Sequence, residues 1–223
     1  MIEGVKLALL IFWLAAAPAA AGTAGDADAL WQRMAAAYAK VEDYRTKVEV
    51  RNYEDDGSFG TRKFLYTFKK PQWIRLDMES PHGGTILVYP TEEGKVAVQL
   101  AGWASFLQLH LAPDSSLLRD PSGQRLNQTD MGLLIRNISR SLKDQRRGPV
   151  RIEEESKGLR LQVLAVDHFR PDVLTLYQFL LDRKLWLPLE VREGTPAGRP
   201  VRSTFFTDFS INTGVPESFF RLD

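Results

Sequence analysis

Hydrophobic and polar residues alternate through most of the chain, and a period of two predicts β-strands with one buried face. The segments that show this alternation are 44–53, 59–69, 73–79, 84–90, 95–100, 150–155, 159–168, 173–181, 185–191 and 201–211. Turn-forming residues separate most of them, as expected for short links between antiparallel neighbours. The pattern therefore predicts an antiparallel sheet of about ten strands.

Two adjacent strands carry more apolar surface than their length requires. Their apolar faces are formed by Phe64, Tyr66 and Phe68 in the first strand and by Ile74, Leu76 and Met78 in the second. Pro71 lies between them and cannot donate to a sheet ladder, so we expect it in the corner of the hairpin. Pro188, in a later strand, is expected at an edge or a bulge for the same reason.

Apolar residues recur at helical spacing in two other segments. Residues 28–42 predict a first helix, with Asp26 or Asp28 as its N-cap. Residues 129–147 predict an amphipathic helix that stops at Gly148 and Pro149. Its apolar stripe consists of Met131, Leu134, Ile135, Ile138 and Leu142. Because this stripe needs a partner of sufficient area, we expect the second helix to lie on the sheet.

About ten strands and three helices predict a mainly β (α+β) fold. Flat sheets of that width are rare, so we expect a strongly curved antiparallel sheet that forms an incomplete β-barrel, lidded by α-helices on its concave side. Residues 101–113 fit neither period, although they contain Trp103, Phe106 and Leu107. An irregular apolar segment of this kind is expected to form a mobile lid or the lip of an entrance.

The N-terminal segment has the features of an export signal. Lys6 precedes the apolar residues 7–14, and Ala19-Ala20-Ala21 has the form of a signal-peptidase site. We therefore expect residues 1–21 to be a cleavable signal peptide and residues 22–223 to form one soluble periplasmic domain; a retained N-terminal anchor is the alternative. The chain has no cysteine, which excludes a lipid-modified cysteine, disulfides and thiolate chemistry.

Charge and motifs do not favour an enzyme or a nucleic-acid-binding protein. The formal net charge is +1, far from the strongly basic balance of a nucleic-acid binder. The three histidines lack metal-ligand spacing, and the sequence has neither a Gly-x-Ser-x-Gly elbow nor a glycine-rich phosphate loop. Acidic clusters at 55–56 and 153–155 are better explained as solvated turn and strand positions. We expect no enzymatic activity, no cofactor and no metal.

The order of several motifs resembles the LolA/LolB superfamily of periplasmic lipoprotein carriers. The motifs are Asp43-Tyr44, Phe68-Lys69-Lys70-Pro71, Ile74-Arg75-Leu76, residues 182–190, and Phe209-Ser210-Ile211-Asn212 before Pro216 and Phe219. The resemblance covers most of residues 28–223, and within the superfamily the chain is more similar to an uncharacterised bacterial branch. The resemblance implies an incomplete eleven-stranded barrel, helical lids and an apolar cavity for acyl chains. Three arginines, Arg45, Arg51 and Arg62, are candidates by position for the arginine that locks the lid in such carriers.

Shared strand parity predicts which side chains would line such a cavity. They are Val48, Val50, Tyr66, Phe68, Ile74, Leu76, Ile86 and Val88 in the strands, Leu134 and Ile138 in the covering helix, and Trp103, Phe106 and Leu107 at the mouth. The alternative is an ordinary packed core with no cavity.

Two functions follow. The first is a carrier or binding protein for an acylated lipoprotein or lipid. The second is a lipid-sensing interaction module in envelope-stress signalling. An inner- or outer-membrane protein partner is compatible with both, and we expect a monomer that does not bind nucleic acid.

Overall fold

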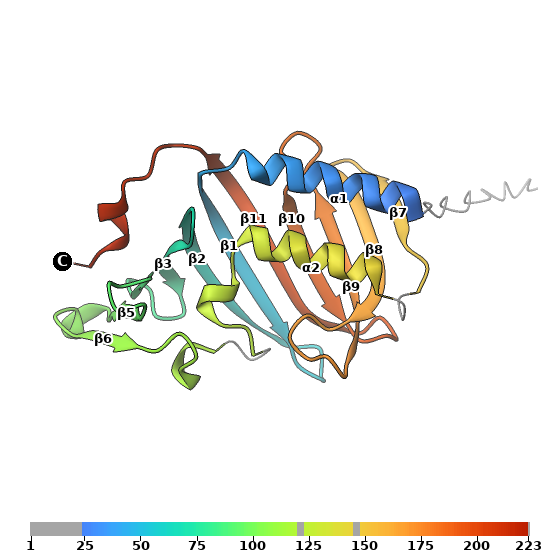
Figure 1. Cartoon of the computed structure of the whole chain (residues 1–223). Helices are drawn as coiled ribbons and strands as arrows, with labels where there is room; N and C mark the ends of the chain where they lie inside the picture. The colour runs from blue at the N-terminus through green and yellow to red at the C-terminus, as the bar shows by residue number, and fades with distance from the viewer. Residues whose placement is uncertain (1–23, 120–122, 145–147, 223) are drawn as a thin grey trace, which may run out of the picture.

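Eleven antiparallel strands form one curved sheet in the computed structural model, which describes residues 24–119, 123–144 and 148–222 (Figure 1). The strands are β1 (Asp43–Tyr53), β2 (Phe59–Lys69), β3 (Trp73–Ser80), β4 (Ile86–Tyr89), β5 (Val96–Gln99), β6 (Gln108–Leu111), β7 (Arg151–Glu155), β8 (Gly158–Val166), β9 (Leu174–Leu181), β10 (Pro188–Gly194) and β11 (Pro200–Ile211). The predicted signal peptide, residues 1–21, lies outside the described residues.

The strand order explains how the chain builds one wide sheet. It runs β6-β5-β4-β3-β2-β1-β11-β10-β9-β8-β7, so the first and last strands pair in the middle. β6 and β7 remain as the two edges, and the sheet is not closed into a barrel. The predicted incomplete barrel with a helical lid is confirmed.

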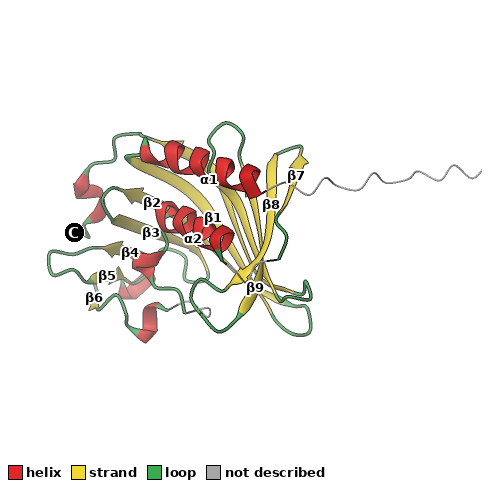
Figure 2. Ribbon diagram, turned by 45° about the vertical axis from the view of Figure 1, so that its right-hand side comes forward, coloured by secondary structure: helices red, strands yellow, loops and turns green. Residues whose placement is uncertain are grey.

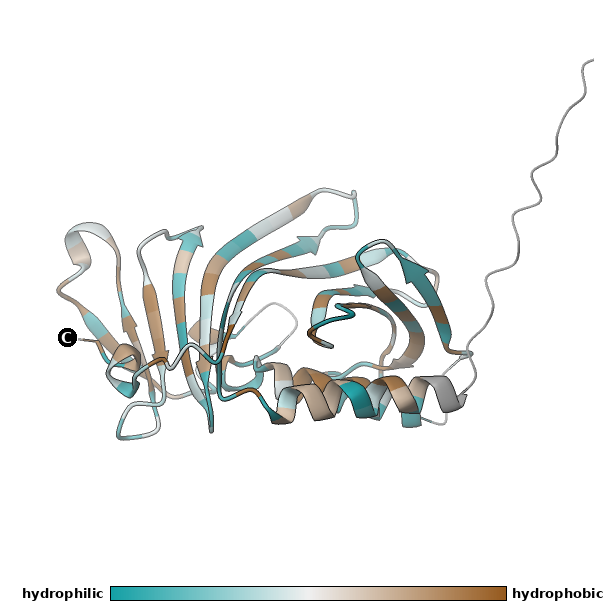
Figure 3. Ribbon diagram, turned by 90° about the horizontal axis from the view of Figure 1, so that it is seen from above, coloured by the Kyte–Doolittle hydropathy of each residue, from teal (hydrophilic) through white to brown (hydrophobic). Residues whose placement is uncertain are grey.

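Two helices, α1 (Ala24–Ala39) and α2 (Met131–Lys143), lie across the inner side of the curved sheet (Figures 2 and 3). α2 is amphipathic, as its stripe predicts, and Asp130 caps it by accepting a hydrogen bond from the backbone N–H of Leu133 at 2.9 Å. The predicted start of the first helix is wrong. Since α1 already begins at Ala24, Asp26 and Asp28 lie inside the helix and not at its cap.

The segment of irregular pattern contains a strand that the sequence does not reveal. Within residues 101–113, the structure has a 3-10 turn, η1 (Gly102–Ala104), followed by strand β6. β6 is four residues long and largely exposed at the sheet edge, so its sequence shows no clear alternation. The described residues therefore contain eleven strands instead of ten, and two α-helices with four short 3-10 turns instead of three helices.

Both prolines have the predicted positions. Pro71 lies in the turn between β2 and β3, and Pro188 lies at a register shift between β9 and β10. In each place the missing proline N–H does not interrupt a regular ladder.

The concave face is divided into two hydrophobic clusters. The first packs α1 and α2 on β8, β9 and β10, and includes Met34, Ile138, Val163 and Phe179, all fully buried. The second lies on β1 to β5 and includes Tyr44, Phe68, Ile74 and Val96. Leu134 of α2 contacts both clusters. The helices therefore pack mainly on β8 to β10, and the candidate site lies mainly on the side of β1 to β6, with α2 along its border.

The C-terminal segment packs on the opposite, outer face of the sheet. The carboxylate of Asp43 accepts hydrogen bonds from the backbone N–H groups of Thr213, Gly214 and Val215 at 2.8–3.3 Å. Arg75 donates to the carbonyl of Phe219 at 3.0 Å and lies over its ring. These contacts hold the chain end against β1 and β3.

Candidate functional site

An apolar cavity of about 600 Å³ lies on the concave face between α2 and the strands, mainly on the side of β1 to β6. Its walls come from β1 to β6, β10 and β11, from α2, from the segment that precedes α2, and from the turn between β8 and β9. The apolar lining consists of Val48, Val50, Phe64, Tyr66, Leu76, Met78, Leu87, Val98, Leu100, Leu109, Leu111, Leu117, Leu118, Leu126, Leu134, Phe169, Val191 and Phe206. The predicted face of the hairpin β2–β3 therefore forms one wall of the cavity.

We call the solvent-exposed part of the described cavity lining the mouth. The mouth is defined by the exposed lining residues Pro81, His82, Leu109, Leu117 and Arg119. Leu117 is 77% exposed, whereas Tyr66 on the opposite wall is 4% exposed. The apolar lining is thus continuous from a buried wall to the surface.

Five of the predicted site residues line the cavity: Val48, Val50, Tyr66, Leu76 and Leu134. Three others, Phe68, Ile74 and Ile138, are buried but do not line it. Phe68 and Ile74 pair with each other close to the β2–β3 corner, where the second cluster fills the space between sheet and helix. Ile138 lies one turn further along α2, in the first cluster. Ligand binding by any of these residues stays a prediction.

Ile86 and Val88 do not line the cavity, and their predicted parity is wrong by one residue. In the β3–β4 ladder Leu76 pairs with Leu87, so Leu87 shares the concave face and does line the cavity. Val88 pairs with Arg75 and lies on the other face. A turn precedes β4, and its length cannot be inferred from alternation inside the strand.

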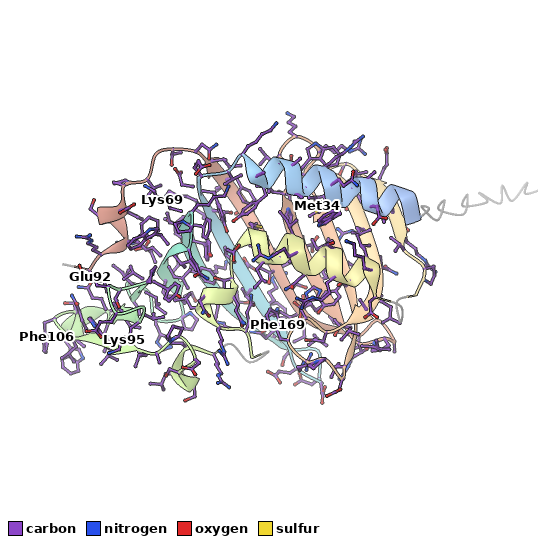
Figure 4. All side chains as sticks on the ribbon, in the orientation of Figure 1. Met34, Lys69, Glu92, Lys95, Phe106 and Phe169 are labelled. Atoms are coloured by element: carbon purple, nitrogen blue, oxygen red, sulfur yellow. The ribbon has the colours of Figure 1, made fainter. Side chains whose placement is uncertain are left out.

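The predicted mouth residues lie outside the cavity. Trp103 is 86% exposed, Phe106 73% and Leu107 41%, and none of them belongs to the lining. Figure 4 shows Phe106 at the far end of the molecule, pointing away from α2. The lining residues of this region come from the short edge strand instead, where Leu109 and Leu111 follow Leu107 at alternating positions.

Sequence reasoning missed the segment before α2, whose described residues 117–119 and 123–130 contribute to the cavity wall. Leu117, Leu118 and Leu126 of this segment belong to the cavity lining. They are the few apolar residues of a polar stretch and have no periodic pattern. A 3-10 turn, η3 (Leu126–Gln128), buries Leu126 to 5% exposure. The adjacent pair Leu117 and Leu118 inside a polar loop was the one feature of the sequence that could have indicated a contribution to the cavity.

Three tyrosines attach the start of α2 to the rest of the fold. Tyr44 on β1 accepts a hydrogen bond from the backbone N–H of Met131 at 3.1 Å. Tyr66 on β2 lies 3.1 Å from the hydroxyl of Thr129, and Tyr38 of α1 donates to Asp130 at 3.4 Å. Burial raises the pKa of each of these tyrosines well above its usual value, so their hydroxyl groups keep their protons. The helix that roofs the cavity is therefore held at its N-terminus.

One wall of the cavity carries a buried ion pair. Arg202 on β11 and Glu193 on β10 are 6% and 8% exposed, and a guanidinium nitrogen lies 2.6 Å from the carboxylate. Arg202 also donates to Gln124 of the segment before α2 at 3.4 Å. This pair joins two strands and that segment.

The three candidate lid arginines have different positions. Arg45 lies over the ring of Phe219 on the outer face, and Arg51 lies over the ring of Phe205. Only Arg62 lines the cavity. Its position opposite Val50 in the β1–β2 ladder places it on the concave face near the strand end.

His168, a residue of the cavity lining, lies within hydrogen-bond distance of a serine of α2. Ser141 Oγ is 2.7 Å from His168 Nε2, and the imidazole stacks on Tyr177 at 4.2 Å. Burial lowers the pKa of His168 to about 4. Ser141 is 2% exposed and is not part of the lining, so the pair connects α2 to the β8–β9 turn and does not present a nucleophile to the cavity.

The described part of the chain holds no group of three or more His, Cys, Asp or Glu side chains arranged to bind a metal ion. Within the same residues, neither helix is long and apolar enough to cross a membrane.

The sequence matches no family model and no curated protein. Among solved structures, the fold is similar to that of MucB, with 16% sequence identity and a TM-score of 0.51 over 89% of this chain. A second similar structure is that of a LolA superfamily protein from Nitrosomonas europaea, with 11% identity and a TM-score of 0.41 over 88% of this chain and 97% of that one. A third is that of the Mycobacterium tuberculosis lipoprotein LppX, with 9% identity and a TM-score of 0.43 over 85% of this chain and 98% of that one.

This chain spans 63% of the length of the MucB chain that it matches. At such low identity the similarity concerns the fold alone. A LolA superfamily protein is among these structures of similar fold, in line with the predicted resemblance.

Proposed function

We propose that this protein is a periplasmic carrier or binding protein that holds acyl chains of a lipoprotein or lipid in the cavity under α2. The observation that carries this proposal is the cavity of about 600 Å³ with a predominantly apolar lining. Its volume lies within the range of roughly 300–1,000 Å³ that is typical of small-molecule sites. The predicted signal peptide supports the periplasmic location in this proposal.

The energetics of acyl-chain burial are sufficient for such a role. Transfer of one methylene from water contributes about 0.8 kcal/mol, so a chain of about sixteen carbons offers on the order of 10 kcal/mol before ordering costs. Binding requires no covalent chemistry, so the proposed role is not enzymatic.

The first experiment is native mass spectrometry of protein purified from periplasm, in which we expect a co-purified lipid. Delipidated protein should then bind a fluorescent fatty acid at micromolar levels. Leu87→Trp would place a large ring in the cavity, and we expect it to weaken binding at least tenfold. Leu185→Trp adds the same ring at an exposed position outside the cavity and serves as the matched control. Absence of binding by the parent, or equal binding by Leu87→Trp, would contradict the proposal.

The second candidate function is a lipid-sensing interaction module without transport activity. The observation that favours it is the exposed aromatic pair Trp103 and Phe106 at the tip of the sheet. Monomeric proteins seldom expose such groups together unless they bind a protein or a membrane. A double Trp103→Ser and Phe106→Ser variant should keep fatty-acid binding and lose cross-linking to a membrane protein in whole cells. Unchanged cross-linking would remove this candidate.

A further inference from the structure

We propose that the tip of the β5–β6 hairpin, residues 101–107, docks this protein on a lipid bilayer by placing Trp103 and Phe106 at the boundary between lipid headgroups and acyl chains. Docking goes beyond the proposed function, because it can be measured with nothing bound in the cavity. The same two side chains favour the second candidate function, in which they contact a protein. Four features of the hairpin favour lipid as their partner.

The first feature is how far the two rings project. The exposed fractions of Trp103 and Phe106 are 86% and 73%, so little protein surface surrounds either ring. Phe106 lies at the far end of the molecule (Figure 4). A rigid partner would need a pocket shaped for both rings, whereas fluid lipid closes around projecting side chains of any shape. Tryptophan and phenylalanine are also typical of segments that bind membrane interfaces.

The second feature is the absence of charge from the hairpin sequence. Residues 96–109 contain no Asp, Glu, Lys or Arg. Transfer of a charged side chain into lipid is costly. This stretch can therefore approach a bilayer without that cost.

The third feature is that the turn supplies partners for its own backbone groups. The N–H of Ser105 donates to the carbonyl of Gly102 at 3.1 Å. The N–H of Leu107 donates to the carbonyl of Ala104 at 2.9 Å. The side-chain amide of Gln99 donates to the carbonyl of Ser105 at 3.1 Å. Because backbone groups without partners are costly in lipid, these bonds suit the tip to shallow insertion.

The fourth feature is an apolar track that connects the tip with the cavity. Val98 pairs with Leu109 in the β5–β6 ladder, and both belong to the cavity lining. The N–H of Leu100, another lining residue, donates to the carbonyl of Leu107 at 3.4 Å and extends the ladder toward the tip. Leu107 shares the strand parity of Leu109, so it continues the same apolar face. An acyl chain that leaves the bilayer at the tip would reach the cavity along this face.

The experiment measures binding of the delipidated mature protein to vesicles of phosphatidylcholine, which carry no net charge. We expect the parent protein to sediment with the vesicles and its tryptophan emission to shift to shorter wavelengths. Trp103→Phe should remove this spectral shift. Higher salt should not weaken the binding, because the contact is apolar and has no charge pair for salt to screen.

Paired substitutions then test whether the tip makes the contact. Trp103→Ser combined with Phe106→Ser should lower the affinity for vesicles at least tenfold. Trp103→Phe combined with Phe106→Trp exchanges the two rings and should keep most of the affinity, because fluid lipid adapts to either arrangement. Phe59→Ser removes a ring that is 50% exposed at the start of β2, outside the hairpin, and should leave vesicle binding unchanged. Thermal unfolding of each variant controls for loss of the fold.

Fatty-acid binding in solution separates docking from the proposed function. It should be equal for the parent and the double serine variant, since neither ring lines the cavity. If the parent binds fatty acid but not vesicles, docking fails and the proposed function stands. If it binds vesicles but no acylated ligand, the proposed function fails and docking stands.

Three other results would overturn the docking proposal. Equal vesicle binding by the parent and the double serine variant would assign the lipid contact to another surface. Loss of vesicle binding in the ring-exchanged variant would show that a fixed shape is required. Cross-linking of the tip to a membrane protein or to a second copy of this chain, without vesicle binding, would assign it to a protein interface.

Discussion

The hydroxyl oxygen of Tyr44, in the sheet, accepts a hydrogen bond from the backbone N–H of Met131, the first residue of α2, at 3.1 Å. The first four N–H groups of any helix lack partners inside the helix, and here a sheet residue supplies one. Tyr44 is 1% exposed and stacks on Tyr66 and Phe68, so its ring cannot easily move. The position of the helix over the cavity is thereby tied to β1.

Replacing Tyr44 with Phe should therefore destabilise the fold by about 1–3 kcal/mol, because the buried N–H of Met131 loses its acceptor. Urea unfolding monitored by circular dichroism measures the change. Tyr89→Phe is the matched control, since the hydroxyl of Tyr89 has no hydrogen bond within the described residues and its ring packs on the same cluster. Equal stability of the two variants would show that the Tyr44 hydroxyl does not hold the helix.

The second residue of α2 is a glycine for a steric reason. A Cβ atom on Gly132 would lie 2.5 Å from Cε1 of Tyr38 and 2.8 Å from Oδ1 of Asp130. Alanine normally stabilises a helix by about 1 kcal/mol relative to glycine, but here the clash should reverse the sign. We expect Gly132→Ala to lower the free energy of unfolding by roughly 1–3 kcal/mol.

Gly60→Ala provides the control for Gly132→Ala, since a Cβ at Gly60 would meet no atom within 4 Å. Differential scanning calorimetry of both variants gives the comparison. A stabilised Gly132→Ala protein would mean that Tyr38 moves aside at little cost.

Two residues of the α2 stripe should respond differently to truncation. Ile138 is fully buried in the first cluster, so Ile138→Ala should cost about 2–5 kcal/mol. Leu134 already borders the cavity, so Leu134→Ala enlarges an existing space and should cost less. Fatty-acid binding should show the opposite order, with the larger change for Leu134→Ala. Similar stability losses for both variants would indicate that Leu134 packs as an ordinary core residue.

The sequence predicts this fold well where a periodic pattern is repeated over many residues. Phe64, Tyr66 and Leu76 alternate regularly, so the concave face of β2 and β3 could be predicted. The apolar stripe of α2 likewise indicates which side of the helix faces the sheet. These patterns are local, and each one depends only on the geometry of a single element.

The errors occur where the answer depends on a register or on distant contacts. A one-residue shift changes the face of every side chain in a strand. For this reason Val88 was predicted to face the cavity, whereas Leu87 does so in the structure. Trp103 and Phe106 are apolar, but apolarity alone does not show whether a side chain faces the cavity or solvent. The pairing of Arg202 with Glu193 needs the β10–β11 hairpin to be placed first. The mouth could therefore not be located from the sequence.

His168 should make the stability of the fold depend on pH. Burial is the main cause of its low pKa; Arg140 and Arg202 also lower it, whereas Asp167 opposes them, and the result is about 4. An imidazole in the unfolded chain has a pKa of about 6.5. The folded state therefore binds the proton less readily than the unfolded state, and protonation favours unfolding.

The sign of this effect defines the pH window. Above about pH 6.5 the imidazole is neutral in both states, and its full contribution to stability is present. As the pH falls from about 6.5 to about 4, the unfolded state takes up a proton that the folded state does not, and this contribution is lost. The shift corresponds to a loss on the order of 3 kcal/mol.

Urea unfolding of the parent and of His168→Gln at several pH values between 7.5 and 4 tests this dependence. The glutamine amide can still pair with Ser141 but cannot titrate in this range. We expect the parent to be the more stable protein at pH 7.5 and its advantage to shrink steadily toward pH 4. His110→Gln removes an exposed imidazole from β6 and controls for changes outside the buried site. A stability difference between parent and His168→Gln that stays constant over this range would show that His168 does not resist protonation in the folded protein.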